Sequence, residues 1–167
     1  EITTRLVGSE MCIRDRLDVA VLGATEIDTS FNINVHTDSN GSIMGGSGGH
    51  SDAAAGSKLA LIAAPLFRGR LPIVRDRVTC ISTPGQDVDV LVTQAGVAVN
   101  PKNTELRERL RAAGLPVVDI HELKERAERI TGVPAPLPVS DRVVAKVISR
   151  DGELLDTIRQ TDNRSGI

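Results

Sequence analysis

A glycine-rich segment between two apolar stretches limits the architectures open to this chain more than any other feature. Residues 36–52 read HTDSNGSIMGGSGGHSD. Glycine loses so much conformational freedom on folding that such a segment is a poor fit to the interior of a helix or strand, and it predicts a loop. The apolar residues 17–22 (LDVAVL) before it and 59–66 (LALIAAPL) after it have the length and composition of strands.

The residues around this loop predict an α/β fold with a mostly parallel sheet. Residues 31–35 (FNINV) alternate in polarity like a second strand, and Ser51 or Asp52 is a good N-cap for a short helix over residues 53–58. Strand, glycine loop, helix and strand in this order are typical of parallel α/β architecture. Because residues 59–64 carry no polar side chain, we expect a central strand that is buried on both faces.

Two helices and several short strands are predicted further along the chain. Asn103 or Thr104 caps the first helix, and the second begins at Asp119 and stops at Gly132. The predicted short strands are residues 71–74, 78–82 and 88–93.

A C-terminal β-hairpin completes the predicted fold. Asp151-Gly152 is a strong turn signal, and it joins residues 143–149 (VVAKVIS) to 154–160 (LLDTIRQ). Because these strands carry charged side chains such as Lys146 and Arg159, we expect the hairpin at an edge of the sheet.

Composition excludes several classes of function. The 167 residues have a net charge of −2, and the aromatic residues are two phenylalanines. The chain therefore lacks both the cationic surface and the stacking side chains that nucleic-acid binding uses. No apolar run approaches the ~20 residues that span a membrane. Two cysteines without CxxC spacing fit a reducing compartment, so we expect a cytoplasmic protein.

The first residues do not read as part of the fold. Residues 10–16 (EMCIRDR) match the translated end of a transposase adapter used to prepare sequencing libraries, although an ordinary polar tail is the alternative. We divide the chain into an adapter-derived or unstructured tail at residues 1–16, a domain at 17–161 and a short tail at 162–167. Because the strand pattern begins abruptly at Leu17, we expect a fragment of a longer protein.

The glycine loop is the feature with the most chemical content. Gly45, Gly46, Gly48 and Gly49 let the backbone approach a ligand, and the helix that follows adds oriented N–H groups. Such a loop can bind a phosphate or a developing oxyanion. The segment lacks the Lys-Ser/Thr of a P-loop and the GxGxxG spacing of a dinucleotide site, so a plain glycine-rich turn is an equal alternative.

Few side chains are candidates for chemistry. His50, with Asp52 two residues later, suits acid/base chemistry or a polar substrate contact, but a histidine near a helix start is more often a capping or surface residue. His36 at a strand end and His121 in the first turn of a helix are weaker candidates. No His or Cys pair has metal-ligand spacing, so we predict no metal site. Cys80 fits a small buried hydrophobe.

An arginine cluster follows the second apolar strand. Arg68, Arg70, Arg75 and Arg77 could hold a polycarboxylate through bidentate contacts. Solvated loop arginines are an equally good interpretation.

Long stretches of the chain resemble a known family. Residues 21–74, 80–101 and 110–124 closely resemble the C-terminal part of citrate lyase alpha subunits, with a match over about residues 17–160. More widely, an ordered set of motifs is similar to the second half of the CoA-transferase superfamily. That set is Gly23-Ala24, Glu26-Ile27-Asp28, Asn32-x-Asn34, the GGSGG loop, Asp52 with Ala55, and residues 88–93 (VDVLVT).

The resemblance implies a CoA-transferase-like half-domain that moves a thioester from acetate to citrate. The thioester would lie on a CoA-derived prosthetic group of the acyl carrier (gamma) subunit, with free CoA thioesters as surrogates and no permanently bound cofactor. A beta subunit would then cleave the citryl thioester. Residues 46–49 (Gly46, Ser47, Gly48 and Gly49) would bind the thioester oxygen, with His50 and Asp52 beside them.

The resemblance also assigns binding residues and leaves gaps. It implies that Asn32, Asn34 and Gly45 bind the cofactor and that Arg68 and Arg70 bind the substrate. The superfamily's glutamate nucleophile has no match, because Glu26 lies in a different pattern. The site would also need the N-terminal half of the alpha subunit, so this chain alone should be inactive.

Two alternatives stay open. A paralogous transferase could act on another carboxylate such as citramalate, because the glycine loop does not separate related acids. A non-catalytic assembly domain would need only the amphipathic helices and the terminal hairpin.

Overall fold

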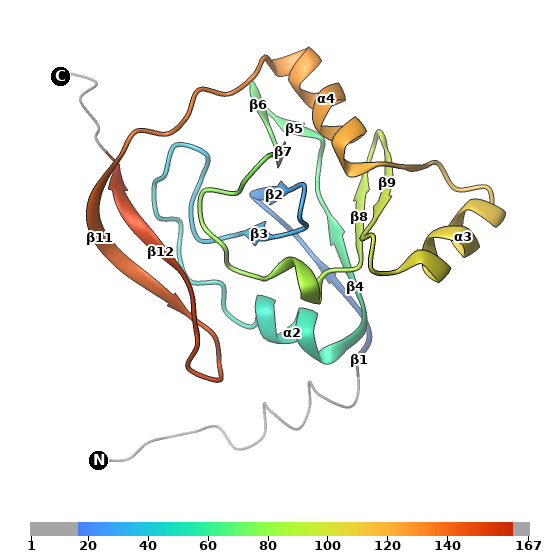
Figure 1. Cartoon of the computed structure of the whole chain (residues 1–167), viewed down its shortest axis with the longest axis horizontal. Helices are drawn as coiled ribbons and strands as arrows, with labels where there is room; N and C mark the ends of the chain where they lie inside the picture. The colour runs from blue at the N-terminus through green and yellow to red at the C-terminus, as the bar shows by residue number, and fades with distance from the viewer. Residues whose placement is uncertain (1–16, 162–167) are drawn as a thin grey trace.

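A five-stranded sheet forms the centre of the protein in a computed structural model, which describes residues 17–161. Its strand order is β1-β4-β8-β9-β10 (Figure 1). Three of the neighbouring pairs are parallel, and β8 pairs with β9 in the antiparallel direction. The predicted α/β class with a mostly parallel sheet is confirmed. The strands are β1 (Leu17–Leu22), β4 (Ser57–Ala63), β8 (Val90–Thr93), β9 (Gly96–Val99) and β10 (Val117–Val118). The predictions for residues 1–16 and 162–167 lie outside the described residues.

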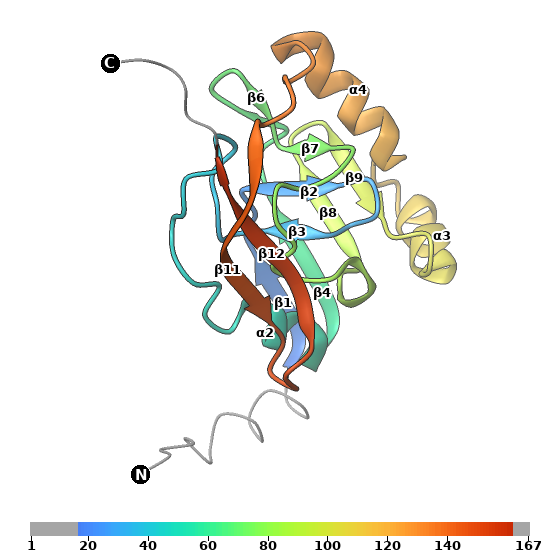
Figure 2. The same ribbon diagram turned by 60° about the vertical axis from the view of Figure 1, so that its left-hand side comes forward.

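Smaller elements surround this sheet. A three-stranded sheet has the order β3-β2-β7, and β5 pairs with β6. The C-terminal strands β11 and β12 form a separate hairpin. The three-stranded sheet, called the small sheet below, lies between this hairpin and the main sheet (Figures 1 and 2). The remaining strands are β2 (Glu26–Asp28), β3 (Ile33–Asn34), β5 (Phe67–Arg68), β6 (Leu71–Pro72), β7 (Val74–Arg75), β11 (Val139–Ile148) and β12 (Leu154–Thr161). The helices are α2 (His50–Gly56), the 3-10 turn η1 (Gly85–Asp87), α3 (Thr104–Ala112) and α4 (Ile120–Thr131).

One face of the main sheet is buried and the other is partly open. Ile62 and Leu91 pack with residues of the small sheet and of α4 in one apolar cluster. On β1, in contrast, Val19 is 48% exposed and Val21 is 66% exposed. The prediction that residues 59–64 are buried on both faces is therefore wrong, because buried and more exposed residues alternate along β4.

The ends of α4 follow the predicted local signals, whereas the start of α3 does so only in position. Asn103 occupies the N-cap position of α3, but its side chain makes no capping hydrogen bond and donates to Asp89 instead. The Asp119 side chain accepts a hydrogen bond from the backbone N–H of His121 at the start of α4. Gly132 ends α4 with a φ of 81°. Because α4 is only 12 residues long, it is far shorter than a membrane span, and no helix within residues 17–161 has the length and apolarity of one.

Residues 78–82 do not form the predicted strand. Acidic side chains take several of their backbone N–H groups: Glu26 accepts from Thr79 at 2.8 Å and Asp156 accepts from Ile81 at 2.9 Å. The N–H of Ser82 donates to the Ile33 carbonyl at 2.7 Å. These bonds replace the ladder that a strand needs. The predicted strand at residues 31–35 is reduced to two residues for a local reason, since Phe31 has a φ of 65° in the turn after Asp28.

Two further predictions are corrected at the loop and the hairpin. Helix α2 begins at His50 with Gly49 as its N-cap, which is earlier than the predicted caps Ser51 and Asp52. The hairpin pairs only within itself and is not an edge of the main sheet. It packs through Val147 and Ile158 against Cys80, which is fully buried as predicted. Burial raises the pKa of the Cys80 thiol to about 12.

Candidate active site

The glycine loop leaves its backbone open. It runs between β3 and α2 and passes beside the hairpin (Figure 1). Gly45 and Gly48 have φ values of 156° and 57°. A Cβ atom added at Gly45, Gly46, Gly48 or Gly49 would meet nothing within 4 Å. Within the described part of the chain, no hydrogen bond uses the N–H groups of residues 45–49 as donors. The loop therefore presents unused backbone donors next to open space.

A cavity of about 630 Å³ lies between this loop and the hairpin. One wall is polar and includes the loop backbone, His36 and Ser82. The opposite wall is largely apolar and comes from β11 and β12. Its apolar residues are Ala145, Val147, Ile148, Leu155 and Ile158. The arrangement can hold a ligand that has a polar group for the glycine backbone and an apolar part for the hairpin.

The His50 side chain connects neighbouring segments of the chain through two hydrogen bonds. Its Nε2 lies 2.8 Å from the carbonyl of Gly23, and its Nδ1 lies 2.8 Å from the Thr83 hydroxyl. A carbonyl oxygen only accepts, so Nε2 carries the proton and Nδ1 accepts from the hydroxyl. Burial lowers the pKa of His50 and favours this neutral form. With both ring nitrogens engaged, the residue is suited to holding the loop in place rather than to proton transfer.

The other predicted site residues lie either directly after the glycine loop or in the segment before it. Asp52 lies in the first turn of α2, directly after the loop. Asn32 and Asn34 lie in the turn and strand before it, and their amides are used inside the fold. Asn32 donates to Asp28 at 3.1 Å, and Asn34 donates to Glu26 at 3.0 Å. Cofactor binding by these two residues stays a prediction, and their observed contacts are structural.

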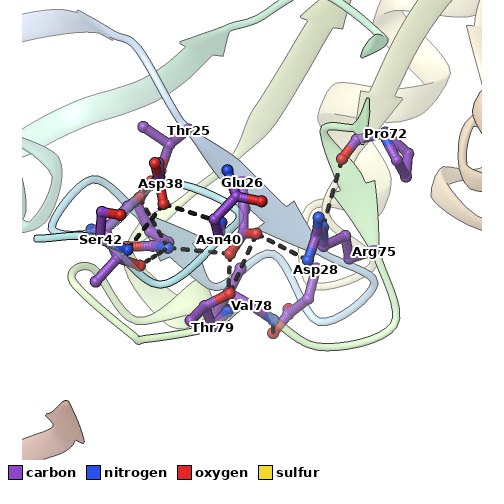
Figure 3. Close-up of polar contacts among 12 residues, drawn as sticks. Thr25, Glu26, Asp28, Asp38, Asn40, Ser42, Pro72, Arg75, Val78 and Thr79 are labelled. Atoms are coloured by element: carbon purple, nitrogen blue, oxygen red, sulfur yellow. Dashed lines mark hydrogen bonds and ion pairs between the residues drawn. The ribbon is translucent and has the colours of Figure 1, made fainter. Parts of the chain in front are cut away.

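A buried polar cluster surrounds Glu26 (Figure 3). The Glu26 carboxylate is inaccessible to solvent and lies 3.0 Å from Nη1 of Arg75. It also accepts hydrogen bonds from the Thr79 backbone and the Asn34 amide. A carboxylate with these partners is poorly placed to act as a nucleophile.

The arginine cluster does not assemble at the glycine loop. Arg75 is paired with Glu26, and Arg77 lines a separate cavity of about 840 Å³ beside the proline-rich residues 133–137. Arg68 ends β5 and Arg70 lies in the turn before β6, which packs on α4. Neither lines the cavity at the loop. Their predicted contact with substrate stays a prediction that this chain's geometry does not support.

The structure adds His36 to the residues around the glycine loop. The residue lines the cavity at the glycine loop, and its Nδ1 lies 3.1 Å from the Gly45 carbonyl. The sequence carries only a weak signal for this, a histidine at a strand end, because the hairpin that closes the cavity is more than a hundred residues later. Within residues 17–161, no group of three or more His, Cys, Asp or Glu residues is placed to hold a metal ion.

Comparison with known proteins identifies relatives over almost the whole chain. A family model described as citrate lyase, alpha subunit, matches residues 6–161. The citrate lyase alpha chain of Klebsiella pneumoniae is 53% identical over 156 residues, covering 93% of this chain and 31% of that protein. The alpha chain of Escherichia coli K12 is 54% identical over 153 residues, covering 92% and 30%. This chain thus spans about 31% of the curated relatives it matches.

A solved structure agrees with these matches. The alpha subunit of citrate lyase from Streptococcus mutans, in complex with citrate, aligns with a TM-score of 0.84 and 46% sequence identity. The alignment covers 87% of this chain and 28% of that chain.

Proposed function

This chain belongs to the citrate lyase alpha subunit family, and from that premise we propose that it forms part of a transferase that converts an acetyl thioester and citrate into a citryl thioester and acetate. The thioester is carried on the CoA-derived prosthetic group of an acyl carrier (gamma) subunit, in a cytoplasmic complex with a beta subunit. CoA thioesters serve as surrogates for that group.

The glycine loop is the observation that carries this proposal. A citrate carboxylate oxygen attacks the acetyl carbonyl carbon, and the electron pair of the C=O bond moves onto oxygen. Backbone N–H groups of Gly46, Ser47, Gly48 and Gly49 stabilise that oxyanion, because they have no other acceptor within the described chain. Collapse expels the thiolate, which then attacks the citryl carbonyl of the mixed anhydride and releases acetate. The sequence offers no match for a covalent enzyme nucleophile, and the burial of Glu26 agrees with a direct route.

The cavity fits the carrier's prosthetic group in its chemistry. Ala145, Val147 and Leu155 provide apolar surface that suits the uncharged part of an arm ending in a thioester, and Lys146 on the same strand adds a cation to the lining. The group supplies the thiol that carries the acyl chain. The residues of this chain bind the arm, orient the carbonyl and keep the loop ordered through His50.

The rest of the subunit completes the site in this proposal. The open sheet face contains exposed Val19 and Val21, which are apolar side chains that water solvates poorly. The chain also spans less than a third of its relatives. We therefore expect the isolated chain to be inactive, since half of a domain interface cannot organise the reacting groups.

Substitution of Gly48 tests the mechanism. In a full-length subunit assembled in its complex, Gly48→Ala places a Cβ where the thioester oxygen must approach, and we expect exchange between acetyl and citryl thioesters to fall about 10²-fold or more, the scale of losing one oxyanion donor. Gly49→Ala should act in the same direction, and His50→Gln should cost less.

Gly114→Ala is the matched control. Gly114 has a φ of 77°, similar to Gly48, and its added Cβ also meets nothing within 4 Å. Both variants therefore carry the same backbone strain, and only Gly48→Ala should lose turnover. Normal exchange in the Gly48 and Gly49 variants would remove the loop from the mechanism. A wild-type complex that binds its partners but does not exchange would favour the assembly-domain alternative.

A further inference from the structure

Lys146 brings a positive charge to the cavity at the glycine loop. Among the described residues that line this cavity, it is the one lysine or arginine, and none is an aspartate or glutamate. The side chain is exposed to solvent, so its ammonium group is accessible to a ligand. The lining therefore combines one cation with the unused backbone N–H groups of the loop, and this combination favours an anionic ligand.

The ammonium group of Lys146 is not used by the part of the chain that the structure describes. On the partner strand of the hairpin, Arg159 is paired with Asp141 at 3.3 Å. Lys146 forms no such ion pair with any acidic residue among residues 17–161. The charge is thus available to a ligand without first breaking a contact inside the fold.

The surroundings of Lys146 hold its backbone at the cavity. The next residue, Val147, is buried in one apolar cluster with Cys80. Opposite Val147 on β12, the Asp156 carboxylate accepts from the Ile81 backbone N–H at 2.9 Å and lines the larger cavity rather than this one. A lysine carries a compact charge on a flexible stem. The strand therefore fixes where the side chain starts, and the stem lets the ammonium adjust to a ligand.

Under the proposed function, two kinds of anionic group are candidates for this contact. One is the phosphate of the CoA-derived arm, and the other is a carboxylate of the acid. The phosphate lies at the end of the arm opposite the thioester, so an arm whose thioester is at the glycines places its phosphate far from them. A non-reacting carboxylate of citrate is only a few bonds from the reacting one. A cation in the same cavity as the glycines therefore fits the acid.

We propose that Lys146 is a specificity-determining residue that binds a non-reacting carboxylate of a polycarboxylic acid while another carboxylate of the same acid reacts at the glycine loop. The inference rests on the proposed function, because it assigns the acid's contact to the same cavity. It gives the acid a cation although Arg68 and Arg70 do not line this cavity. Acetate has a single carboxylate, so the contact distinguishes the acid that enters from the acetate that leaves.

Binding of two acids to the full-length subunit tests this assignment. Citrate is compared with 3-hydroxy-3-methylbutanoate, which retains the hydroxyl group and one carboxymethyl group and lacks the other two carboxylates. Both are measured by calorimetry, the weaker acid in competition with citrate. Lys146→Met removes the charge at similar length, and Lys146→Arg retains it. Arg142→Met is the matched control, because Arg142 is an exposed cation on the same strand that does not line the cavity.

We expect wild type, Lys146→Arg and Arg142→Met to prefer citrate over the monocarboxylate. Lys146→Met should weaken citrate binding about tenfold, the scale of one hydrogen bond to a charged group, and should leave the affinity of the monocarboxylate unchanged. Added salt should weaken citrate binding less steeply in Lys146→Met than in wild type. Equal weakening of both acids, no weakening of either, or the same citrate loss in Arg142→Met would overturn the assignment.

Titration with CoA distinguishes the two anionic groups. Lys146→Met should bind CoA as wild type does. A loss of CoA affinity as large as the loss for citrate, or a loss confined to CoA, would assign the cation to the arm's phosphate and overturn the proposal.

Exchange assays on the assembled complex keep this proposal apart from the proposed function. Lys146→Met should raise KM for citrate about tenfold and leave kcat and the KM for the acetyl thioester unchanged, because the contact is made equally before and during the reaction. If citrate binding depends on Lys146 but wild type does not exchange acyl groups, the transfer reaction fails and the carboxylate contact stands. If wild type exchanges normally and Lys146→Met changes neither citrate affinity nor its KM, only the Lys146 assignment fails.

Discussion

The buried polar cluster around Glu26 and the glycine loop differ in how their polar groups are used. In the cluster, Glu26 is paired with Arg75 and accepts from Thr79 and Asn34. In the loop, the N–H groups of residues 45–49 have no acceptor within the described chain, and the ring of His36 retains an unpaired nitrogen. The charged and polar side chains of the Glu26 cluster therefore stabilise the fold. The backbone of the loop glycines, which have no functional side chains, is left available to a ligand.

This difference follows from burial. A carboxylate that is removed from water must be compensated by charge and hydrogen bonds, so Glu26 can be tolerated only with all of its partners present. The loop glycines are exposed, and water satisfies their N–H groups until a ligand displaces it. The two regions should consequently respond to substitution in opposite ways, in stability for the cluster and in activity for the loop.

Removal of Arg75 should have the largest effect on stability. Arg75→Met retains most of the side-chain length and leaves the Glu26 charge buried without its cation, so the free energy of unfolding should fall by about 3–5 kcal/mol. Urea denaturation followed by circular dichroism measures the change. Lys58→Met is the control, because its ion pair with Asp18 is exposed and should contribute nothing measurable. Equal losses in both variants would show that the buried Glu26–Arg75 pair contributes no more to stability than an exposed ion pair.

Much of the fold could be predicted because its signals are local. The ends of α4 follow from Asp119 and Gly132, and the parallel order follows from strands separated by a loop and a helix. Residues 78–82 could not be predicted in this way. Their apolar character favours a strand, but the N–H groups of Thr79 and Ile81 donate to the carboxylates of Glu26 and Asp156, which are more than fifty residues away in either direction.

The same distinction between local and long-range signals applies to the candidate site. Openness of the loop was predictable, since glycine allows close approach wherever it lies. The structural use of Asn32 was not, because its acceptor oxygen binds the N–H of Gly85 at 2.9 Å, across 53 residues. The place of His36 in a cavity wall depends on the hairpin, and separation of Arg68 from the loop depends on β6 packing against α4.

Two glycine substitutions compare a packed position with the open loop, and the expected loss of stability at the packed position is intermediate in size. A Cβ at Gly85 would lie 2.0 Å from the Ser30 carbonyl oxygen, a backbone atom that cannot move aside easily. Gly85→Ala should therefore destabilise the chain by about 1–3 kcal/mol, the usual cost of overpacking. Gly46→Ala meets nothing within 4 Å and has no positive φ, so its midpoint in urea should not change. Its effect should instead appear as slower acyl exchange in the assembled complex, and a shifted midpoint would contradict this view of the loop.

His50 links the end of the glycine loop to Gly23 and Thr83, and its titration should produce the smallest effect. Burial lowers the pKa of His50 from the usual value for histidine in an unfolded chain, about 6.5. The unfolded chain therefore takes up a proton before the folded one does. His50 contributes its full stabilisation above pH ~6.5, and this is lost as the pH falls through the lower pKa of the folded state. His50→Gln retains a donor for the Gly23 carbonyl and cannot titrate. Unfolding free energies measured from pH 8 to pH 5 should fall more steeply for wild type than for His50→Gln, while the carboxylates contribute equally to both. Parallel curves would show that the imidazole is not held neutral between Gly23 and Thr83, and would reopen a proton-transfer role for His50.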